Sequence, residues 1–230
     1  MPPYYGIDIY YLVLILPAVI LSLIAQVKVK STFTKYSKIY SQKGLTGAQV
    51  AEQVLAYHGV SGVEVQKIKG HLTDHFDPKT NIIRLSDSVY GSCSVAAIGV
   101  AAHEAGHAVQ HAQNYAPIKV RNSLVPVVNF SSGFSWVAIL LGFLFSFQPL
   151  VLMGIALFSF AVLFQLITLP VELNASARAV RTIADSGILN QTEQSGAKSV
   201  LTAAAMTYVA AAIMSLAQLL RLILLFRRND

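Results

Sequence analysis

Residues 99–113 read "GVAAHEAGHAVQHAQ", and this stretch carries the main clue to both fold and chemistry. Its small apolar residues and regularly spaced polar ones predict a helix, over about 92–113. His103 and His107 are four positions apart, and Glu104 is next to His103. Side chains four apart share one helix face, about 6 Å apart along the axis. Two imidazoles so placed can bind one Zn²⁺, with the glutamate as general base.

A catalytic zinc site needs a third protein ligand. His111 repeats the spacing but lies about 12 Å from His103 along a straight helix, too far to share one ion. Glu172 is the better candidate, because it is the only acidic residue between Glu104 and Asp185. The open alternatives are four residues of a predicted hairpin: His71, Asp74, His75 and Asp77.

The composition indicates a membrane protein. Hydrophobic residues make up 54% of the chain and charged residues only 12%, about half of what soluble domains carry. The net charge of +6 does not indicate nucleic acid, because the lysines cluster beside apolar blocks. The single cysteine, Cys93, fits a polar part that faces a reducing compartment. We expect a lipid bilayer as partner and no nucleic acid.

The apolar segments predict about four transmembrane helices. The first covers 7–27 and is expected to be retained, because a basic start and a small-residue cleavage site are lacking. Residues 122–171 carry no formal charge and are too long for one span. The "SFQP" break at 146–149 divides them into a hairpin of two spans, 124–146 and 150–169.

The hairpin returns the chain to the membrane side that it left. Glu172 then follows the second span at once, in a predicted helix over 171–186, on the side that holds His103 and His107. A last helix, over 200–226, is predicted to span or to lie at the membrane, since Arg221 interrupts its apolar run.

The polar part covers 28–122. A helix is predicted to begin after Thr46, its N-cap, and to end at Gly59. "VEVQKIKG", "HLTDHFD" and "NIIRLS" then alternate as strands do and predict a small antiparallel sheet. Several lysines and no acidic residue lie between 27 and 51, so the positive-inside rule places this part in the cytoplasm.

Four stretches of the chain resemble the YugP-like neutral zinc metallopeptidases, a bacterial membrane-protein family. They are "LTDHFDPKTNIIRLSDSVY", "AAIGVAAHEAGHAVQHA", "LPVELNASARA" and "AAAMTYVAAAI". The resemblance implies a zincin-like α+β metallopeptidase domain and a plasma-membrane location. More distantly, the chain is similar to the membrane gluzincins typified by HtpX and the CAAX prenyl protease.

In those gluzincins a helix after a membrane hairpin supplies a glutamate ligand in a Glu-x-x-Ala-Asp pattern. Glu172 and Ala175 match this pattern, whereas Ser176 replaces the aspartate, which supports the metal site. Either Ser176 or Asn174 is expected to take over that support. The relatives also imply an edge strand that binds substrate, for which "TNIIRLS" is the candidate. The candidate oxyanion donors are His75, Arg178, Arg181 and Tyr208.

The sequence thus predicts a mainly α, integral membrane protein whose residues 1–230 form a single metallopeptidase domain. The predicted activity is zinc-dependent cleavage of membrane or membrane-proximal proteins, with His103, His107 and Glu172 as ligands and Glu104 as base. Two alternatives stay open: a non-catalytic zinc-bound scaffold or chaperone partner, and an intramembrane protease of the site-2 type. Proteases of the site-2 type resemble one another in taking an aspartate ligand from a later membrane span. Residues 122–171 hold no aspartate.

Overall fold

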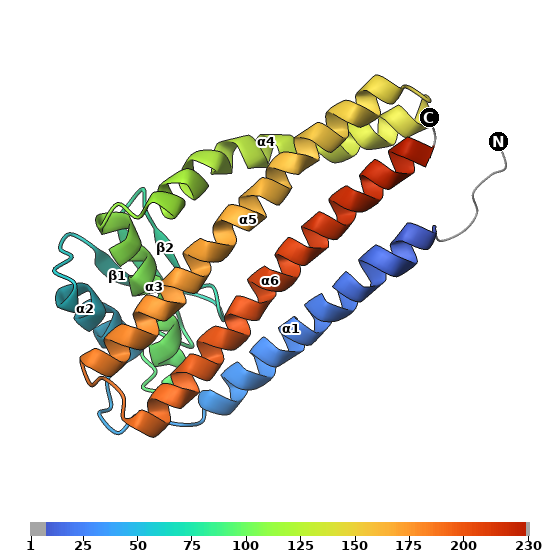
Figure 1. Cartoon of the computed structure of the whole chain (residues 1–230). Coiled ribbons are helices and arrows are strands. Elements are labelled where there is room, and N and C mark those ends of the chain that lie inside the picture. The colour runs from blue at the N-terminus through green and yellow to red at the C-terminus, as the bar shows by residue number, and fades with distance from the viewer. Residues whose placement is uncertain (1–7, 229–230) are drawn as a thin grey trace. The chain divides into compact units, whose positions relative to one another are not determined.

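A computed structural model describes residues 8–228 of the chain (Figure 1). Residue 7, the first of the predicted 7–27 span, lies outside the described residues. The helices are η1 (Tyr11–Ile15, a π-helical turn), α1 (Leu16–Tyr36), α2 (Gly47–Tyr57), α3 (Val95–Ala112), α4 (Ala116–Leu144), α5 (Gln148–Asp185) and α6 (Gln191–Arg228). The strands are β1 (Glu64–Ile68), β2 (His75–Asp77) and β3 (Ile82–Ser86).

Within these residues, four helical segments are long and apolar enough to cross a membrane: Tyr11–Tyr36, Ala116–Leu144, Gln148–Asp185 and Gln191–Arg227. The predicted class, a mainly α membrane protein with about four spans, is therefore confirmed. The predicted hairpin break is also found, because α4 ends at Leu144 and α5 begins at Gln148.

The Glu172 helix is not a separate element. The sequence predicts a helix over 171–186 that follows the second hairpin span, but α5 runs without interruption from Gln148 to Asp185. Pro170 lies inside it. A proline removes one backbone hydrogen bond, which apolar helices of membrane proteins tolerate. Glu172 is therefore on the same continuous helix as the predicted span.

The described residues fall into two compact units. The membrane unit contains 8–25, 120–169 and 207–228, and the site unit contains 26–119 and 170–206. The membrane unit exposes large apolar side chains, such as Phe130 at 62%, Leu140 at 67% and Leu144 at 70%. That is the reverse of a soluble protein and suits contact with lipid.

Arg221 has a partner inside the membrane unit. Its Nε lies 3.1 Å from Oδ2 of Asp8, and its guanidinium lies 5.4 Å from the centre of the Tyr11 ring. An arginine in an apolar helix is costly unless it is paired. The ion pair explains how α6 can carry this charge within its apolar run.

The site unit is built around a buried core formed by α2, α3, β3 and the adjoining parts of α5 and α6. Thr46 caps α2 as predicted: its hydroxyl accepts from Gln49 N, and the Gln49 side chain accepts from Thr46 N. The helix ends before Gly59, whose φ of +65° is the left-handed conformation of a helix stop. α3 packs on α2 and on the sheet (Figure 1).

The sheet is mixed, so the prediction of an antiparallel sheet was wrong. Its strand order is β1-β3-β2, with β1 parallel and β2 antiparallel to β3. The predicted middle strand shortens to three residues, because Asp74 accepts hydrogen bonds from Ser86 N and Oγ and holds the preceding residues as a loop. That loop carries the chain across β3, so β1 and β2 lie on opposite sides of it.

The predicted edge strand is also corrected. "TNIIRLS" contains β3, whose two sides are both paired, with Ile83 opposite Val65 on one side and Phe76 on the other. A strand with both neighbours in place cannot add a third. β2 is the edge strand on which α3 packs.

Candidate metal centre

α3 presents the candidate ligands from the core of the site unit. Its first turn is capped by Ser94, whose Oγ accepts from Ala97 N at 3.2 Å. Ala101, Ala105 and Ala108 are fully buried and follow helical spacing along one face. Their small side chains allow neighbouring elements to approach closely, so the histidines are carried by a tightly packed helix.

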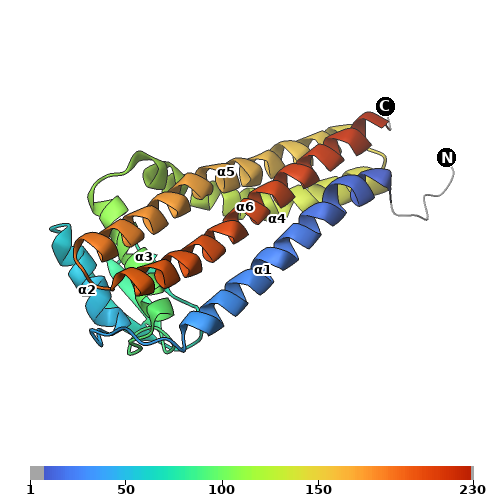
Figure 2. The same cartoon turned by 60° about the horizontal axis from the view of Figure 1, so that its bottom comes forward.

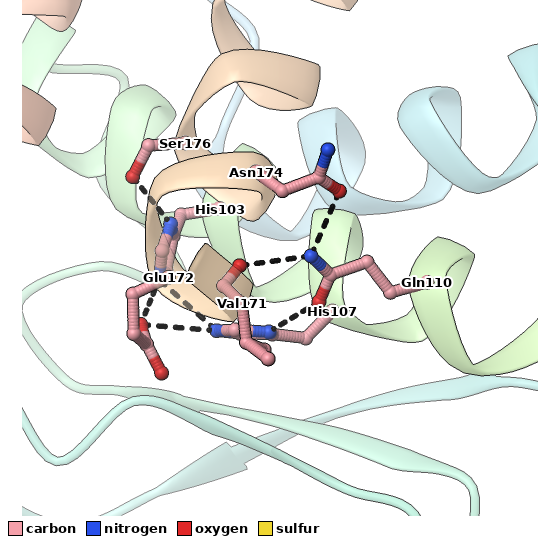
Figure 3. Close-up of polar contacts among 7 residues, drawn as sticks. All are labelled: His103, His107, Gln110, Val171, Glu172, Asn174 and Ser176. Carbon is pink, nitrogen blue, oxygen red and sulfur yellow. Dashed lines mark hydrogen bonds and ion pairs between the residues drawn. The ribbon is translucent and has the colours of Figure 1, made fainter. Parts of the chain in front are cut away.

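Three potential ligand atoms converge beside α3 (Figure 3). The Nε2 atoms of His103 and His107 are 3.2 Å apart. Oε2 of Glu172, from α5, lies 3.3 Å from the first and 3.4 Å from the second. Ligands about 2.0–2.1 Å from a tetrahedral zinc ion are about 3.3–3.4 Å apart. The three atoms are thus spaced as one face of such a tetrahedron.

The Glu172 oxygen supports this fit. Glu172 is 3% exposed, and its Oε2 makes no hydrogen bond, although both imidazoles lie at ion-pair distance. A buried polar atom without a partner is unfavourable. Two imidazole nitrogens and one carboxylate oxygen are ligands that Zn²⁺ accepts, and three protein ligands leave a position open. The residues present therefore fit a zinc ion.

Gln110 orients His107. The Gln110 side chain is fully buried, and its Nε2 donates to Val171 O at 2.8 Å and to Asn174 Oδ1 at 3.0 Å. Because a backbone carbonyl only accepts, the amide nitrogen must face Val171, and the amide oxygen faces His107 Nδ1 at 3.0 Å. His107 therefore donates from Nδ1 and keeps the lone pair of Nε2 for a ligand bond.

Ser176 orients His103 in the way that Gln110 orients His107. Its Oγ lies 3.1 Å from His103 Nδ1 and can accept that proton, which again leaves Nε2 free (Figure 3). The sequence offered Ser176 or Asn174 as the supporting residue. Ser176 contacts His103 directly, whereas Asn174 accepts from Gln110, whose amide oxygen faces His107.

The charges around His107 favour a cation. Burial alone lowers the pKa of His107, but the close approach of Glu172 and the negative charge of Glu104 raise it above its usual value overall. The direction of this shift means that the surroundings attract positive charge. Because a metal ion is also a positive charge, the same field favours its binding.

Glu104 has a carboxylate that is available for chemistry. The residue is 8% exposed, and its side chain makes no hydrogen bond with any residue of 8–228. Its charge nevertheless acts on His107, one turn further along α3. A nearly buried carboxylate beside the candidate ligands is thus left without a hydrogen-bond partner among the described residues.

The two aspartates of the predicted hairpin lie outside this cluster. Asp74 is bound to Ser86. Asp77 accepts from Lys79 N at 2.9 Å and from Arg84 Nη1 at 3.1 Å. Hydrogen bonds from Thr80, Lys79 and Arg84 lower the pKa of Asp77 to about 2. Both aspartates therefore stabilise the hairpin.

The remaining histidines have other neighbours. The ring of His71 meets Phe33 edge-on at 5.5 Å, and the ring of His111 lies 5.8 Å from Phe76. His75 Nδ1 is 2.9 Å from Thr73 O. Because successive strand residues point to opposite faces and Phe76 points to α3, His75 points away from α3.

Gly106 explains how α5 comes close enough. A Cβ at this position would lie 2.9 Å from the backbone oxygen of Ala175. Side chains larger than hydrogen would thus push α5 away from α3. The glycine of the "HEAGH" motif is therefore a packing requirement of the site.

Gln110 is the supporting residue that sequence reasoning missed. A signal was present, because it lies three residues after His107 and so shares its helix face. A single glutamine near the end of a helix is, however, equally typical of a solvent-exposed helix end. Only its complete burial reveals the role.

Comparison with known proteins agrees with the site. The family model described as "Putative neutral zinc metallopeptidase" matches residues 11–227. "Putative membrane protease YugP" from Bacillus subtilis (strain 168) is 48% identical over 216 residues, which cover 94% of this chain and 96% of that protein. No solved structure matches the chain. With a match over nearly all of its length, the chain belongs to this family of neutral zinc metallopeptidases.

Proposed function

We propose that the protein is a zinc-dependent endopeptidase of the gluzincin type, in which His103, His107 and Glu172 bind the metal. The observation that carries the proposal is the 3.2–3.4 Å triangle of two imidazole nitrogens and one carboxylate oxygen. Glu104 beside the triangle completes an H-E-x-x-H motif. We further propose that residues 1–230 act as a single domain at the plasma membrane.

The chain's own residues have distinct roles in this proposal. A bound Zn²⁺ would supply Lewis acidity and lower the pKa of a coordinated water. Glu104 accepts a proton from the water as the water oxygen bonds to the carbonyl carbon of the substrate peptide. Glu104 then donates that proton to the peptide nitrogen, so that the C–N bond breaks and the amine leaves. Gln110 and Ser176 keep the histidine Nδ1 protons in place, so that each Nε2 faces the metal.

The edge of the sheet provides a place for a substrate backbone. β2 is paired with β3 on one side, and α3 packs against it. We propose that an extended substrate segment adds to the outer edge of β2, beside the metal centre. Arg178 and Arg181, which belong to the site unit, stay candidates for the oxyanion donor, whereas His75 points away from α3.

The substrates proposed are membrane or membrane-proximal proteins, cut on the cytoplasmic side. The support is the lysine-rich and acid-free segment after the first apolar stretch, together with the positive-inside rule. Labelling of single introduced cysteines in inverted vesicles with an impermeant reagent tests the side. The cytoplasmic location would be contradicted if the reagent labelled a cysteine near His107 in intact cells but not in inverted vesicles.

The activity is tested with the purified full chain, zinc and fluorescently labelled casein as an unfolded substrate. We expect Glu104→Gln to keep its zinc and to lose at least about 100-fold in cleavage rate. The matched control is His111→Gln, on the same helix but outside the cluster, which should retain both. Unchanged cleavage by Glu104→Gln would refute the general-base role, and zinc-loaded wild type without any cleavage would favour a scaffold.

A further inference from the structure

A second polar site lies in the site unit, between α1 and α6. The C-terminal part of α1 runs beside the N-terminal part of α6 in both views (Figures 1 and 2). Between them is a groove with a volume of about 660 Å³, lined in part by Lys28, Lys35 and Lys198. It shares no residue with the metal centre.

Each helix lines the groove with a polar stripe. On α1, Lys28, Ser31, Thr32 and Lys35 follow the spacing of a single helix face. On α6, Ser195, Lys198, Ser199 and Thr202 repeat that spacing. The groove is thus formed by two facing stripes of cations and hydroxyls.

The positive charge of this groove is not compensated. No aspartate or glutamate lines it, and within 8–228 no carboxylate forms an ion pair with its three lysines. Glu193, two residues before the α6 stripe, is bound to the backbone N–H groups of Gln42 and Asn190. Three like charges that face one groove repel one another, so an anion bound between them is favoured.

The hydroxyls add hydrogen-bonding capacity. The side chains of Thr32 and Thr202 make no hydrogen bond to any other residue of 8–228, although Thr32 is only 8% exposed. Together with three ammonium groups, they match a phosphate group, which offers several strong acceptor oxygens.

The shape of the groove favours a lipid as the source of that phosphate. At one end the Tyr36 ring, which lines the groove, packs on Gly196, at which a Cβ would lie 2.7 Å from the ring. The other end has Lys28 on α1 and the apolar Ala203 and Met206 on α6. At that end both helices continue into their apolar segments, so acyl chains attached to a bound headgroup would leave toward the bilayer.

We propose that this groove binds the phosphate group of an anionic phospholipid. Lys28, Lys35 and Lys198 neutralise the phosphate, and the threonine hydroxyls donate to its oxygens. Lys28 directly follows the apolar stretch that ends at Val27. Lipid headgroups lie at the ends of apolar membrane spans, so Lys28 is placed at the depth of the headgroups.

The test measures retention of phosphatidylglycerol by the purified full chain with native mass spectrometry. We expect the triple variant Lys28→Gln/Lys35→Gln/Lys198→Gln to bind it about tenfold or more weakly than wild type. The matched control is Lys30→Gln/Lys38→Gln/Lys43→Gln, which removes the same number of positive charges from lysines that do not line the groove. It should bind as wild type does. Equal binding by both triple variants would overturn the proposal.

Two further arms identify the ligand. Phosphatidylcholine should be retained less than phosphatidylglycerol, and millimolar inorganic phosphate should not displace the lipid. Displacement by inorganic phosphate would assign the groove to a free anion instead. If the triple variant does not fold, Thr202→Phe fills the groove without a change of charge and should also lower retention; wild-type retention by it would contradict the proposal. Zinc content should be unchanged throughout, which separates this proposal from the peptidase.

Discussion

Two groups of titratable residues in the site unit look alike in sequence but differ in how their polar atoms are satisfied. At the hairpin of strands β2 and β3, Asp77 accepts hydrogen bonds from Lys79, Thr80 and Arg84. At α3, Glu172 has two imidazole nitrogens at ion-pair distance, but its buried Oε2 makes no hydrogen bond. The hydrogen bonds of the Asp77 group are therefore satisfied within the protein. The group formed by Glu172 and the two histidines of α3 can still accept a cation. Unsatisfied and convergent polar atoms thus distinguish a site from a structural cluster.

The largest difference is expected when one carboxylate of each group is removed. Glu172→Ala should weaken zinc binding more than about 100-fold, because it deletes one of the three proposed ligands. Asp77→Ala should leave zinc binding unchanged, since its hydrogen bonds lie within the hairpin. A chelator-competition titration measures both affinities. Equal zinc affinities of the two variants would remove the distinction.

A smaller loss is expected from a change at Gln110, which contacts the proposed ligand His107. Gln110→Leu keeps the side chain's approximate volume but removes the acceptor for His107 Nδ1. Zinc affinity should fall about 10–100-fold. The same titration applies, with His111→Gln as the control. Wild-type affinity in Gln110→Leu would show that packing alone orients His107.

The closeness of α3 and α5 can be tested with a pair of glycines on the same helix. Gly106→Ala should lower the free energy of unfolding by about 1–3 kcal/mol and weaken zinc binding, because its Cβ would meet Ala175 O at 2.9 Å. Gly99→Ala is the control, since its Cβ would make an ordinary contact of 3.6 Å with Ala197. Thermal unfolding with and without zinc measures both. Indistinguishable variants would refute the packing role.

The smallest effect is expected from the pH dependence of the hairpin. The pKa of Asp77 is lowered to about 2 in the folded chain, from an ordinary value of 3.8. A lowered folded-state pKa stabilises the fold above the unfolded value, and this contribution is lost as the pH falls through the folded value. The stability difference between wild type and Asp77→Asn should therefore be constant above about pH 5 and shrink between about pH 4 and 2. Because Asp77 is on the surface, the difference should be small. A difference that grows toward low pH would contradict this.

Local features were predictable because they depend on residues close in the chain. The N-cap at Thr46 and the helix stop at Gly59 are found where the sequence indicates them. The break between the two hairpin helices lies at 145–147 and overlaps the expected 146–149. The pairing of His103 with His107 follows from helix geometry alone. Glu172 was indicated by elimination, as the only carboxylate between Glu104 and Asp185.

Long-range features were not predictable in the same way. Alternation identifies β1, β2 and β3 as strands but not which neighbours each one pairs with, so the mixed order and the central place of β3 went unseen. The continuity of α5 through Pro170 and the burial of Gln110 depend on surrounding helices.

By itself, the sequence of this protein determined a mainly α membrane chain and half of a candidate metal site, because hydropathy and helical periodicity act over short stretches. The tertiary structure decided the rest: the approach of Glu172 to within 3.4 Å of both histidines, the amide that orients His107, and the glycine that admits α5. Those features require residues more than 60 positions apart to pack together. Their packing depends on the volumes and hydrogen bonds of the whole core, which no local pattern of residues specifies.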